Sequence, residues 1–128
     1  MPNFTFKKAE RLKSRKVISR LFKEGKSFST YPLRIIWIQT DSSDNTFPAQ
    51  FSMSVPRRSF AKAVQRNDLR RRIRESYRLN KHLLYQHLEN SDQQYGLMFI
   101  YVAKEALPYS KIELAMKKIL KRLTHQLP

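Results

Sequence analysis

The segment AVQRNDLRRRIRESYR, Ala63–Arg78, contains six arginines beside two acidic residues, and its apolar positions recur with the spacing of an α-helix. On a helical wheel of about 100° per residue, one arc collects the apolar and small polar side chains of this region. Its members are Leu69, Ile73, Ser76, Tyr77, Asn80, Leu83 and Leu84. We therefore predict one long helix, from about Phe60 to His87, that packs this arc against a sheet.

The adjoining arc of the same helix is basic and is predicted to contain no acid. Its members are Asn67, Arg70, Arg71, Arg74, Arg78 and Lys81, with Arg66 at the border of the apolar arc. Asp68 and Glu75 fall on the other side, whereas a solvated helix face usually mixes the two signs of charge. Like charges so close together are tolerated best where a ligand compensates them, and arginine binds phosphate oxygens through two N–H groups at once. We interpret this arc as a nucleic-acid-binding surface.

The composition indicates the same class of ligand. The chain of 128 residues carries 26 Lys and Arg against 10 Asp and Glu, a net charge of +16. The excess positive charges repel one another in the folded state, so a polyanionic ligand is expected to compensate them. Nucleic acid is the first candidate. An anionic membrane surface is weaker, because the basic helix keeps no lipid-facing apolar side once its apolar arc is covered.

Other classes are excluded by what the sequence lacks. The absence of cysteine excludes a disulfide scaffold, a cysteine nucleophile and cysteine-based zinc sites. No apolar run approaches the ~20 residues that span a bilayer, and the N-terminal stretch lacks the apolar region of a secretory signal. We therefore expect a cytoplasmic protein with no membrane partner.

Strands are predicted on the N-terminal side of the long helix. Residues 27–40 are rich in β-branched and aromatic side chains and indicate two strands, or one strand broken near Pro32, with Leu33–Thr40 the surer piece. Residues 41–48 read as a polar turn. Ala49–Val55 then alternates like a returning strand.

Two further helices are predicted near the ends of the chain. Ser14 can cap a first helix that ends near Gly25. A last helix follows residue 107, with a capping box expected between Ser110 and Glu113. Its inner stripe is Ile112, Ala115, Met116, Ile119, Leu120 and Leu123.

These elements together predict the fold class. The continuous apolar run Tyr95–Ala103 is typical of a central strand buried on both faces. The order of elements is then α-β-β-β-α-β-α, which predicts a single-domain α+β sandwich over residues 1–128, with helices against a mostly antiparallel sheet. The strands before and after the long helix are expected to form one parallel pair.

The segment FAKAVQRNDLRRRIR, Phe60–Arg74, resembles the signature of the bacterial ribonuclease P protein subunit. The matching positions are Phe60, Ala63, Arg66, Asn67, Arg70, Arg71 and Arg74. RLKSRKVISRLFKEGK, Arg11–Lys26, resembles the first helix of that family, and SMSVPRR, Ser52–Arg58, resembles the strand and basic turn before its long helix.

The resemblance implies a fold like the second domain of ribosomal protein S5, with an unusual left-handed β-α-β crossover through the long basic helix. It also implies a function: the protein would assist a catalytic RNA that uses Mg²⁺ to remove the 5′ leader of precursor tRNA. The expected partners are that RNA subunit and the precursor tRNA, and the protein alone is expected to be a monomer. No catalytic or metal-binding residue is expected in this chain.

The resemblance implies two groups of site residues. One group is expected to bind RNA: Arg66, Asn67, Arg70, Arg71, Arg74, Arg78, Arg57, Arg58 and Lys62. The other is expected to line a cleft for the single-stranded leader between the first helix and the sheet: Phe22, Ile18, Trp37 and Phe51. Whether Ile36 or Trp37 faces this cleft depends on a register of one residue, which stays open.

Two rival functions are weighed at this stage, another RNA-binding module and a DNA-binding protein, and a nuclease acting alone is disfavoured. Another RNA-binding module, such as a ribosomal protein, would have the same charge and fold class. A DNA-binding protein would need a helix free to enter the major groove, yet the apolar arc ties this helix to the sheet. A nuclease acting alone would need clustered carboxylates, but Asp68 and Glu75 lie two turns apart.

Two aromatic residues near the N-terminus, Phe4 and Phe6, have two possible roles. They could reach RNA bases or pack on the domain.

Overall fold

The computed structural model describes residues 4–40, 47–89 and 93–127. The helices and strands of this part, in chain order, are η1 Lys8–Glu10, α1 Arg15–Glu24, β1 Lys26–Thr30, β2 Leu33–Thr40, β3 Ala49–Ser54, α2 Ala63–Asn80, α3 His82–Leu88, β4 Gln94–Tyr101 and α4 Tyr109–Gln126. Most of the polar turn predicted at 41–48 lies outside the described residues.

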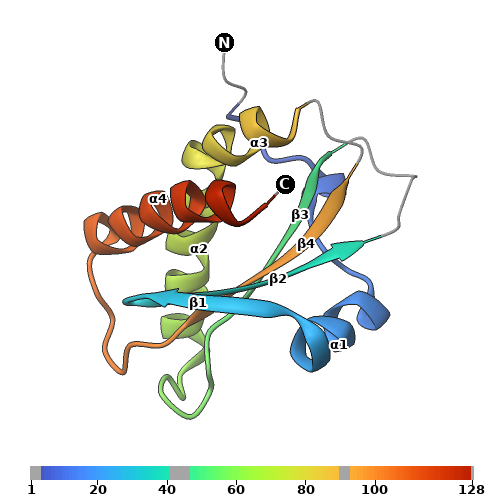
Figure 1. Ribbon diagram of the computed structural model, residues 1–128. Helices are drawn as coiled ribbons and strands as arrows, with labels where there is room; N and C mark the ends of the chain where they lie inside the picture. The colour runs from blue at the N-terminus through green and yellow to red at the C-terminus, as the bar shows by residue number, and fades with distance from the viewer. Residues whose placement is uncertain (1–3, 41–46, 90–92, 128) are drawn as a thin grey trace.

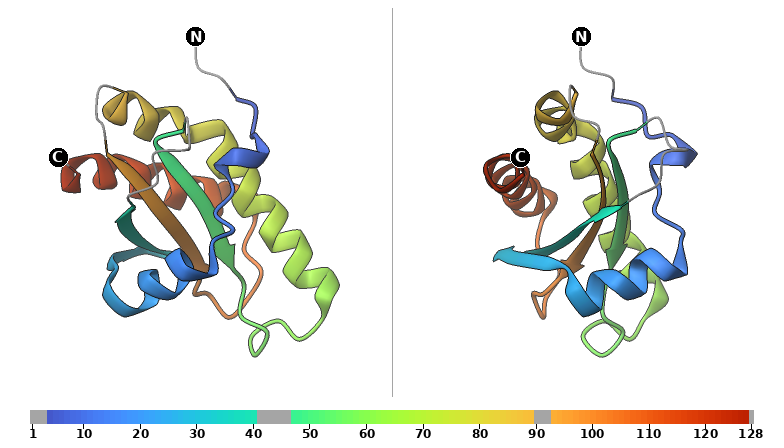
Figure 2. Two further views of the ribbon diagram at one scale, coloured as in Figure 1. Left: turned by 90° about the vertical axis from the view of Figure 1, so that its right-hand side faces the viewer. Right: turned by 45° about the vertical axis from the view of Figure 1, so that its right-hand side comes forward.

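A four-stranded sheet in the order β1-β2-β4-β3 separates two layers of helices (Figures 1 and 2). The β1–β2 and β2–β4 pairs are antiparallel, and β3–β4 is parallel. The mostly antiparallel sheet with one parallel pair is therefore confirmed, as is the central place of β4. The handedness of the connection from β3 to β4 stays a prediction.

The two faces of the sheet carry two separate cores. The larger core joins the sheet to α2, α3 and α4, and includes Leu69, Ile73 and the inner stripe predicted for α4. The smaller core lies under α1 and is formed by Leu12, Leu21, Ile36, Ile38 and Met98. The two inner strands, β2 and β4, are therefore apolar on both faces, because helices cover both faces of the sheet.

The long helix predicted from Phe60 to His87 is in fact two helices, and it begins later than expected. α2 starts at Ala63 because the carbonyls of Phe60 and Ala61 accept hydrogen bonds from the Arg66 guanidinium, both at 2.8 Å. The chain then changes direction at Lys81, between α2 and α3 (Figure 1). The break coincides with the side chain of Lys81 entering the interior, where it meets Glu10.

The ends of the other helices confirm one prediction and contradict another. Ser14 caps α1 by accepting a hydrogen bond from the N–H of Val17 at 3.3 Å. The capping box predicted for α4 is wrong, because α4 begins at Tyr109, two residues before the start that a cap at Ser110 would give, and Ser110 lies inside its first turn. The Glu113 carboxylate instead accepts hydrogen bonds from Tyr109 Oη and Asn80 Nδ2, at 3.2 and 3.3 Å. It therefore joins α4 to α2.

Gly25 ends α1 because it leaves room where a side chain would collide. A Cβ added there would lie 2.4 Å from the Leu21 carbonyl oxygen and 2.6 Å from Ile36 Cγ2, while the φ angle of −68° is open to any residue. We expect Gly25→Ala to lower the free energy of unfolding by about 1–3 kcal/mol through overpacking. Urea denaturation followed by circular dichroism measures this loss.

Gly96→Ala is the matched control for Gly25→Ala. Its added Cβ would approach Val17 Cγ1 at 3.1 Å and Leu12 Cδ2 at 3.4 Å, both of them side-chain atoms that can move. The loss at position 96 should therefore be the smaller of the two. An equal or larger loss at position 96 would contradict the role given to the Leu21 carbonyl.

Candidate nucleic-acid interface

The apolar side of α2 fixes the direction in which its basic side chains point. Leu69, Ile73 and Tyr77 are fully buried, and Ser76 and Asn80 are buried beside them. These are the positions predicted for the sheet-facing arc. Because this side is locked into the larger core, the arginines on the other side of α2 project from a rigid surface.

Within the described residues, Arg66, Arg70 and Arg74 are the arginines of α2 that form no ion pair, and Arg70 and Arg74 lie on its outer side. Both are half-buried, and Arg70 Nη1 donates only to Asn67 Oδ1, at 3.2 Å. Asn67 itself is exposed. The exposed side chains of Arg57, Arg58 and Lys62 continue this basic surface along the loop before α2. We call these six residues the α2 surface.

Arg66 has a structural role as well. Its guanidinium holds the carbonyls of Phe60 and Ala61, and its own backbone N–H bonds the carbonyl of Lys62 at 3.2 Å. The side chain therefore fixes the loop that carries Arg57 and Arg58 to the first turn of α2. The Nη1 donor of Arg66 is therefore used within the protein.

The acids of α2 are less segregated than the wheel predicts. Asp68 forms ion pairs with Arg71 and Arg72, each at 2.7 Å. Glu75 forms an ion pair with Arg78, whose hydrogen bonds hold the pKa of the Glu75 carboxyl below its usual value. The prediction of a basic arc without acids is therefore wrong at Arg71 and Arg78. Each forms an ion pair with an acid three residues earlier, because side chains at i and i+3 are neighbours on a helix surface.

Lys81 was predicted on the basic surface and is instead buried. Its side chain is 4% exposed, and Nζ lies 2.8 and 2.6 Å from the two carboxylate oxygens of Glu10. Tyr85 donates a hydrogen bond to the same carboxylate at 2.5 Å. The residue thus anchors the N-terminal segment to the junction of α2 and α3.

The N-terminal segment crosses the outer edge of the sheet beside α2. The Phe6 ring packs edge-on against Phe51 and Tyr77, with ring centroids 5.7 and 6.1 Å apart. Arg78 Nη1 donates to the carbonyl of Phe4 at 2.7 Å. Of the two alternatives for Phe6, packing on the domain is therefore confirmed, and Arg78 is occupied with this segment as well as with Glu75.

The other predicted site is the face of the sheet beside α1. Ile18 is half-buried on this face, and Phe22 on the same helix is 58% exposed. Ile36 lies in the core beneath them. The open question of register is thereby answered: Ile36 faces α1, and its neighbour Trp37 does not.

Trp37 and Phe51 were predicted to line this cleft, and that placement is wrong. Both are buried in the larger core on the opposite face of the sheet. Trp37 packs edge-on against Phe28, and Phe51 stacks on Tyr77 with centroids 4.4 Å apart. Successive residues of a strand point to opposite faces, so an error of one residue moves an aromatic side chain through the sheet.

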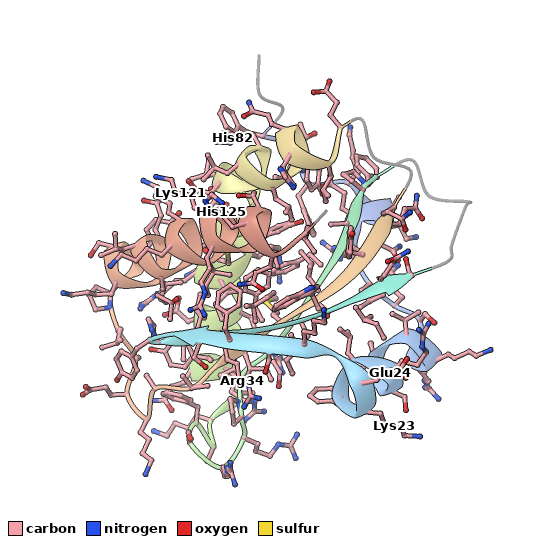
Figure 3. All side chains as sticks on the ribbon, in the orientation of Figure 1. Lys23, Glu24, Arg34, His82, Lys121 and His125 are labelled. Atoms are coloured by element: carbon pink, nitrogen blue, oxygen red, sulfur yellow. The ribbon has the colours of Figure 1, made fainter. Side chains whose placement is uncertain are left out.

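A groove that the sequence did not indicate continues the α1 face past the helix. It has a volume of about 870 Å³ and lies where β2 begins and β4 ends. Ile100 forms part of its floor, and Val102 is 43% exposed at its side. Arg34, Arg58 and Lys104 surround it, and Figure 3 shows Arg34 on the lower side of β2. Because Arg58 also belongs to the α2 surface, the two sites are continuous.

The described residues contain no group of three or more His, Cys, Asp or Glu side chains that could hold a metal ion. None of the described helices is long and apolar enough to cross a membrane. His82 and His125 lie on α3 and α4, in the layer opposite α1 (Figure 3).

Comparison with known proteins gives a consistent result. The family model for ribonuclease P matches residues 6–124. The ribonuclease P protein component of Porphyromonas gingivalis W83 is 37% identical over 127 residues, which cover 99% of this chain and 92% of that protein. The corresponding component of Rippkaea orientalis is 34% identical over 56% of this chain and 58% of its own length.

Solved structures share the fold. The Staphylococcus aureus RNase P protein superposes with a TM-score of 0.70 at 21% identity, over 91% of this chain and 96% of that chain. The Thermotoga maritima RNase P protein gives a TM-score of 0.69 at 24% identity, over 88% of this chain and 96% of that chain.

Proposed function

The chain belongs to the ribonuclease P protein family, and from this membership we propose that it binds the catalytic RNA subunit through the α2 surface and the 5′ leader of precursor tRNA through the α1 face of the sheet. As a ribonuclease P protein component it is part of an endoribonuclease complex that processes tRNA.

The observation that carries the first part of the proposal is the rigid, unpaired charge of Arg70 and Arg74. Neither guanidinium is neutralised by an acid of the described chain, although Asp68 and Glu75 neutralise the arginines beside them. Guanidinium groups bind phosphate oxygens in pairs of hydrogen bonds. Asn67, one turn before Arg70, adds an amide that can donate to and accept from a sugar or base edge. This combination suits the backbone of a folded RNA.

The second part of the proposal rests on the exposed apolar side chains of the α1 face and the basic groove beyond it. Phe22 and Ile18 offer apolar surface on which unpaired bases can pack, and Arg34, Arg58 and Lys104 offer cations to the phosphates. Stacking and phosphate contacts accept many sequences, because every base has an aromatic face and every nucleotide a phosphate. Such a groove suits an enzyme that processes many different leaders.

We also propose that the chemistry of cleavage resides in the RNA. Mg²⁺ supplies the Lewis-acid chemistry of phosphodiester hydrolysis when it is bound, and the described part of this chain offers no cluster of ligands for it. The protein's contribution is to lower the repulsion among crowded phosphates, which lets the RNA fold and bind its ions at cellular salt. The proposed setting is the cytoplasm, with the protein a monomer before it meets the RNA.

Reconstitution tests this function. The full chain is added to the cognate RNA subunit with precursor tRNA at a low Mg²⁺ concentration, and release of the 5′ leader is followed with time. We expect the protein to raise the cleavage rate, and to raise it more for a leader long enough to reach the α1 face than for a leader of one nucleotide. No stimulation would refute the proposed function and would favour another RNA-binding role, such as that of a ribosomal protein.

The Arg70→Ala/Arg74→Ala variant tests the α2 surface. Each arginine that contacts a phosphate should contribute about one unit to the slope of log K against log salt concentration. We expect the double variant to bind the RNA subunit more weakly and to lower that slope by about two, with the circular dichroism spectrum unchanged. Filter binding over a series of salt concentrations gives both quantities.

Lys121→Ala is the control for these arginines, since it removes an exposed charge from α4, on the same side of the sheet as α2 but outside the α2 surface (Figure 3). Its salt slope should stay close to that of the unmodified chain. If Lys121→Ala reduced the slope by about one unit, the amount expected for each arginine of the double variant, net charge rather than the α2 surface would account for binding.

A further inference from the structure

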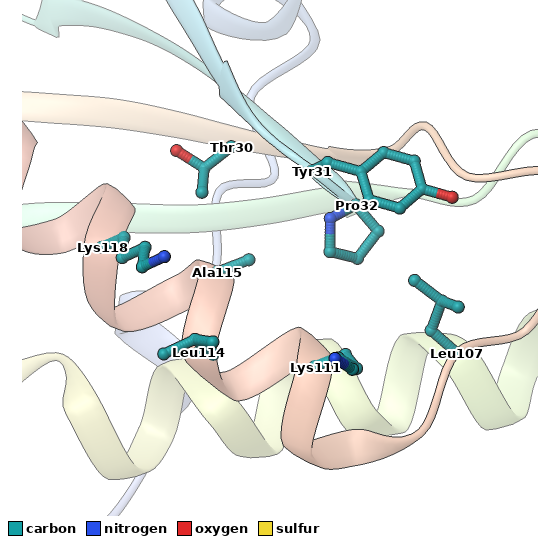
Figure 4. Close-up of a pocket in the computed structure, with 8 residues that line it drawn as sticks. All are labelled: Thr30, Tyr31, Pro32, Leu107, Lys111, Leu114, Ala115 and Lys118. Atoms are coloured by element: carbon teal, nitrogen blue, oxygen red, sulfur yellow. The ribbon is translucent and has the colours of Figure 1, made fainter.

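A pocket of about 310 Å³ lies on the other side of the molecule from the α1 face, between the β1–β2 turn and α4 (Figure 4). Tyr31 and Pro32 form the turn, while Leu114, Lys111 and Lys118 come from α4. Leu107, in the segment before α4, closes one end. None of these residues belongs to the α2 surface or to the groove beside α1.

The walls of this pocket are apolar and open to solvent. Tyr31 is 64% exposed and Leu114 is 51% exposed, and they are two of the few large apolar side chains that the described chain leaves so exposed. Leu114 is not part of the inner stripe of α4, so no core contact explains it. Pro32 is buried between them and forms the floor. The pocket thus presents an aromatic ring and an aliphatic side chain to a flat ligand.

The two lysines give the pocket a charge. Lys111 and Lys118 are exposed and lie seven residues apart, which separates their Cα atoms by about 10 Å along the helix axis. Neither forms an ion pair within the described residues, and no acid lines the pocket. Glu113, the acid between them in sequence, is occupied by Asn80, Tyr109 and Lys117. The pocket is therefore apolar inside and cationic along its α4 side.

We propose that this pocket binds one unpaired nucleotide of single-stranded RNA, with the base against Tyr31 and Leu114 and the flanking phosphates on Lys111 and Lys118. Stacking on an aromatic side chain combined with cations along the strand is the usual composition of such sites. An anion site alone would not need the apolar walls, and an apolar peptide would leave both ammonium groups without a partner. The inference takes RNA as the ligand from the proposed function and adds a contact surface between the β1–β2 turn and α4, on the side of the sheet opposite α1.

The test is a titration of the full ¹⁵N-labelled chain with a five-nucleotide adenylate RNA, followed by NMR at about 0.15 M salt. We expect saturable shifts at the amides of Tyr31, Leu107 and Leu114, in addition to those at the other RNA-binding surfaces. Tyr31→Ala should weaken binding at the pocket amides by about fivefold or more, because it removes the stacking platform. Lys111→Ala/Lys118→Ala should weaken it and make it less dependent on salt.

Lys121→Ala is the matched control, because it removes a charge from the same helix outside the pocket, and screening limits its reach at this salt concentration. Its pocket shifts should follow the isotherm of the unmodified chain. Adenosine 5′-monophosphate should bind more weakly than the RNA, since it cannot place a phosphate on each lysine. Equal binding would assign the pocket to free nucleotides and would overturn the proposal.

Two further outcomes would also overturn it. If the RNA shifted amides of α2 and the α1 face but none at the pocket, the pocket would not be an RNA site, while the proposed function would stand. If inorganic phosphate alone produced the pocket shifts, and Tyr31→Ala left them unchanged, the site would bind an anion only. Conversely, pocket binding that persists in a chain without stimulation of cleavage would refute the proposed function and leave this inference intact.

Discussion

Leu69→Asp is expected to unfold the domain. Leu69 is fully buried where α2 meets the larger core, so the substitution places a carboxylate where no partner can reach it. Burying an unpaired charge costs several kcal/mol, and loss of the leucine side chain adds about 2–5 kcal/mol. Since a domain of this size is stable by about 5–15 kcal/mol in total, the two losses remove most of that margin. Loss of the cooperative denaturation transition, followed by circular dichroism, is the expected result.

Val64→Asp is the control for this variant. Val64 lies on the same helix, one turn and a residue before Leu69, and is 80% exposed. An aspartate there stays in water and near the N-terminus of α2, where a negative charge is favourable. Its midpoint of denaturation should therefore stay close to that of the unmodified chain. A cooperative transition in Leu69→Asp at the same midpoint would show that the apolar arc of α2 has been misplaced.

Glu10→Gln is expected to have the second largest effect. The carboxylate of Glu10 is fully buried and accepts hydrogen bonds from Lys81, from Tyr85 and from the backbone N–H of Lys7. Removing its charge leaves the Lys81 ammonium buried without a counter-ion. Breaking a buried ion pair in this way costs about 3–5 kcal/mol. Urea denaturation should show that loss of unfolding free energy.

The double variant Glu10→Leu/Lys81→Met separates the contribution of the ion pair to stability from that of the neighbouring hydrogen bonds. Replacing both members of a buried pair by apolar residues of similar size is often neutral or stabilising, because both desolvation penalties disappear together. We expect this variant to recover much of the stability that Glu10→Gln loses. A double variant as unstable as the single one would mean that the hydrogen bonds of Tyr85 and Lys7, rather than the pair of charges, hold this junction together.

The Glu10–Lys81 pair also has a consequence for the interface. Lys81 anchors the N-terminal segment that contains Phe6. The Phe6 ring in turn packs on Phe51 of β3 and on Tyr77 near the end of α2. The position of α2 against the edge of the sheet therefore depends on a residue 71 positions away in the chain. Variants of Glu10 are expected to weaken RNA binding only as far as they unfold this junction. Arg70→Ala/Arg74→Ala should weaken it without any loss of stability.

The elements of the fold follow from local patterns in the sequence. The spacing of Leu69, Ile73 and Tyr77 predicts the buried side of α2, and the continuous apolar run at Tyr95 predicts the central strand. Ser14 predicts the start of α1. These predictions are confirmed because each depends on the period of one element or on a cap within one turn, and both are set by neighbours in the chain.

The candidate site could be predicted only in part. The basic side of α2 is where the wheel places it, with Asn67, Arg70 and Arg74 on the outside. The wheel could not show that Arg71 and Arg78 would bend toward acids at i−3, since side chains of this length span adjacent arcs. Nor could it show that Arg34 and Lys104 border one groove, because they come from different strands and loops.

The sequence by itself determined the class of the fold and the buried sides of α2 and α4, and its charge predicts a polyanionic ligand, since periodicity and charge are local properties that add up along the chain. Only the tertiary structure decided that Ile36 rather than Trp37 faces α1, that Lys81 is buried against Glu10, and that Tyr31 meets α4 in a pocket. Each of these depends on a partner from a distant part of the chain. A helical or strand period cannot specify such a partner, because it fixes the direction of a side chain but not what packing brings opposite to it.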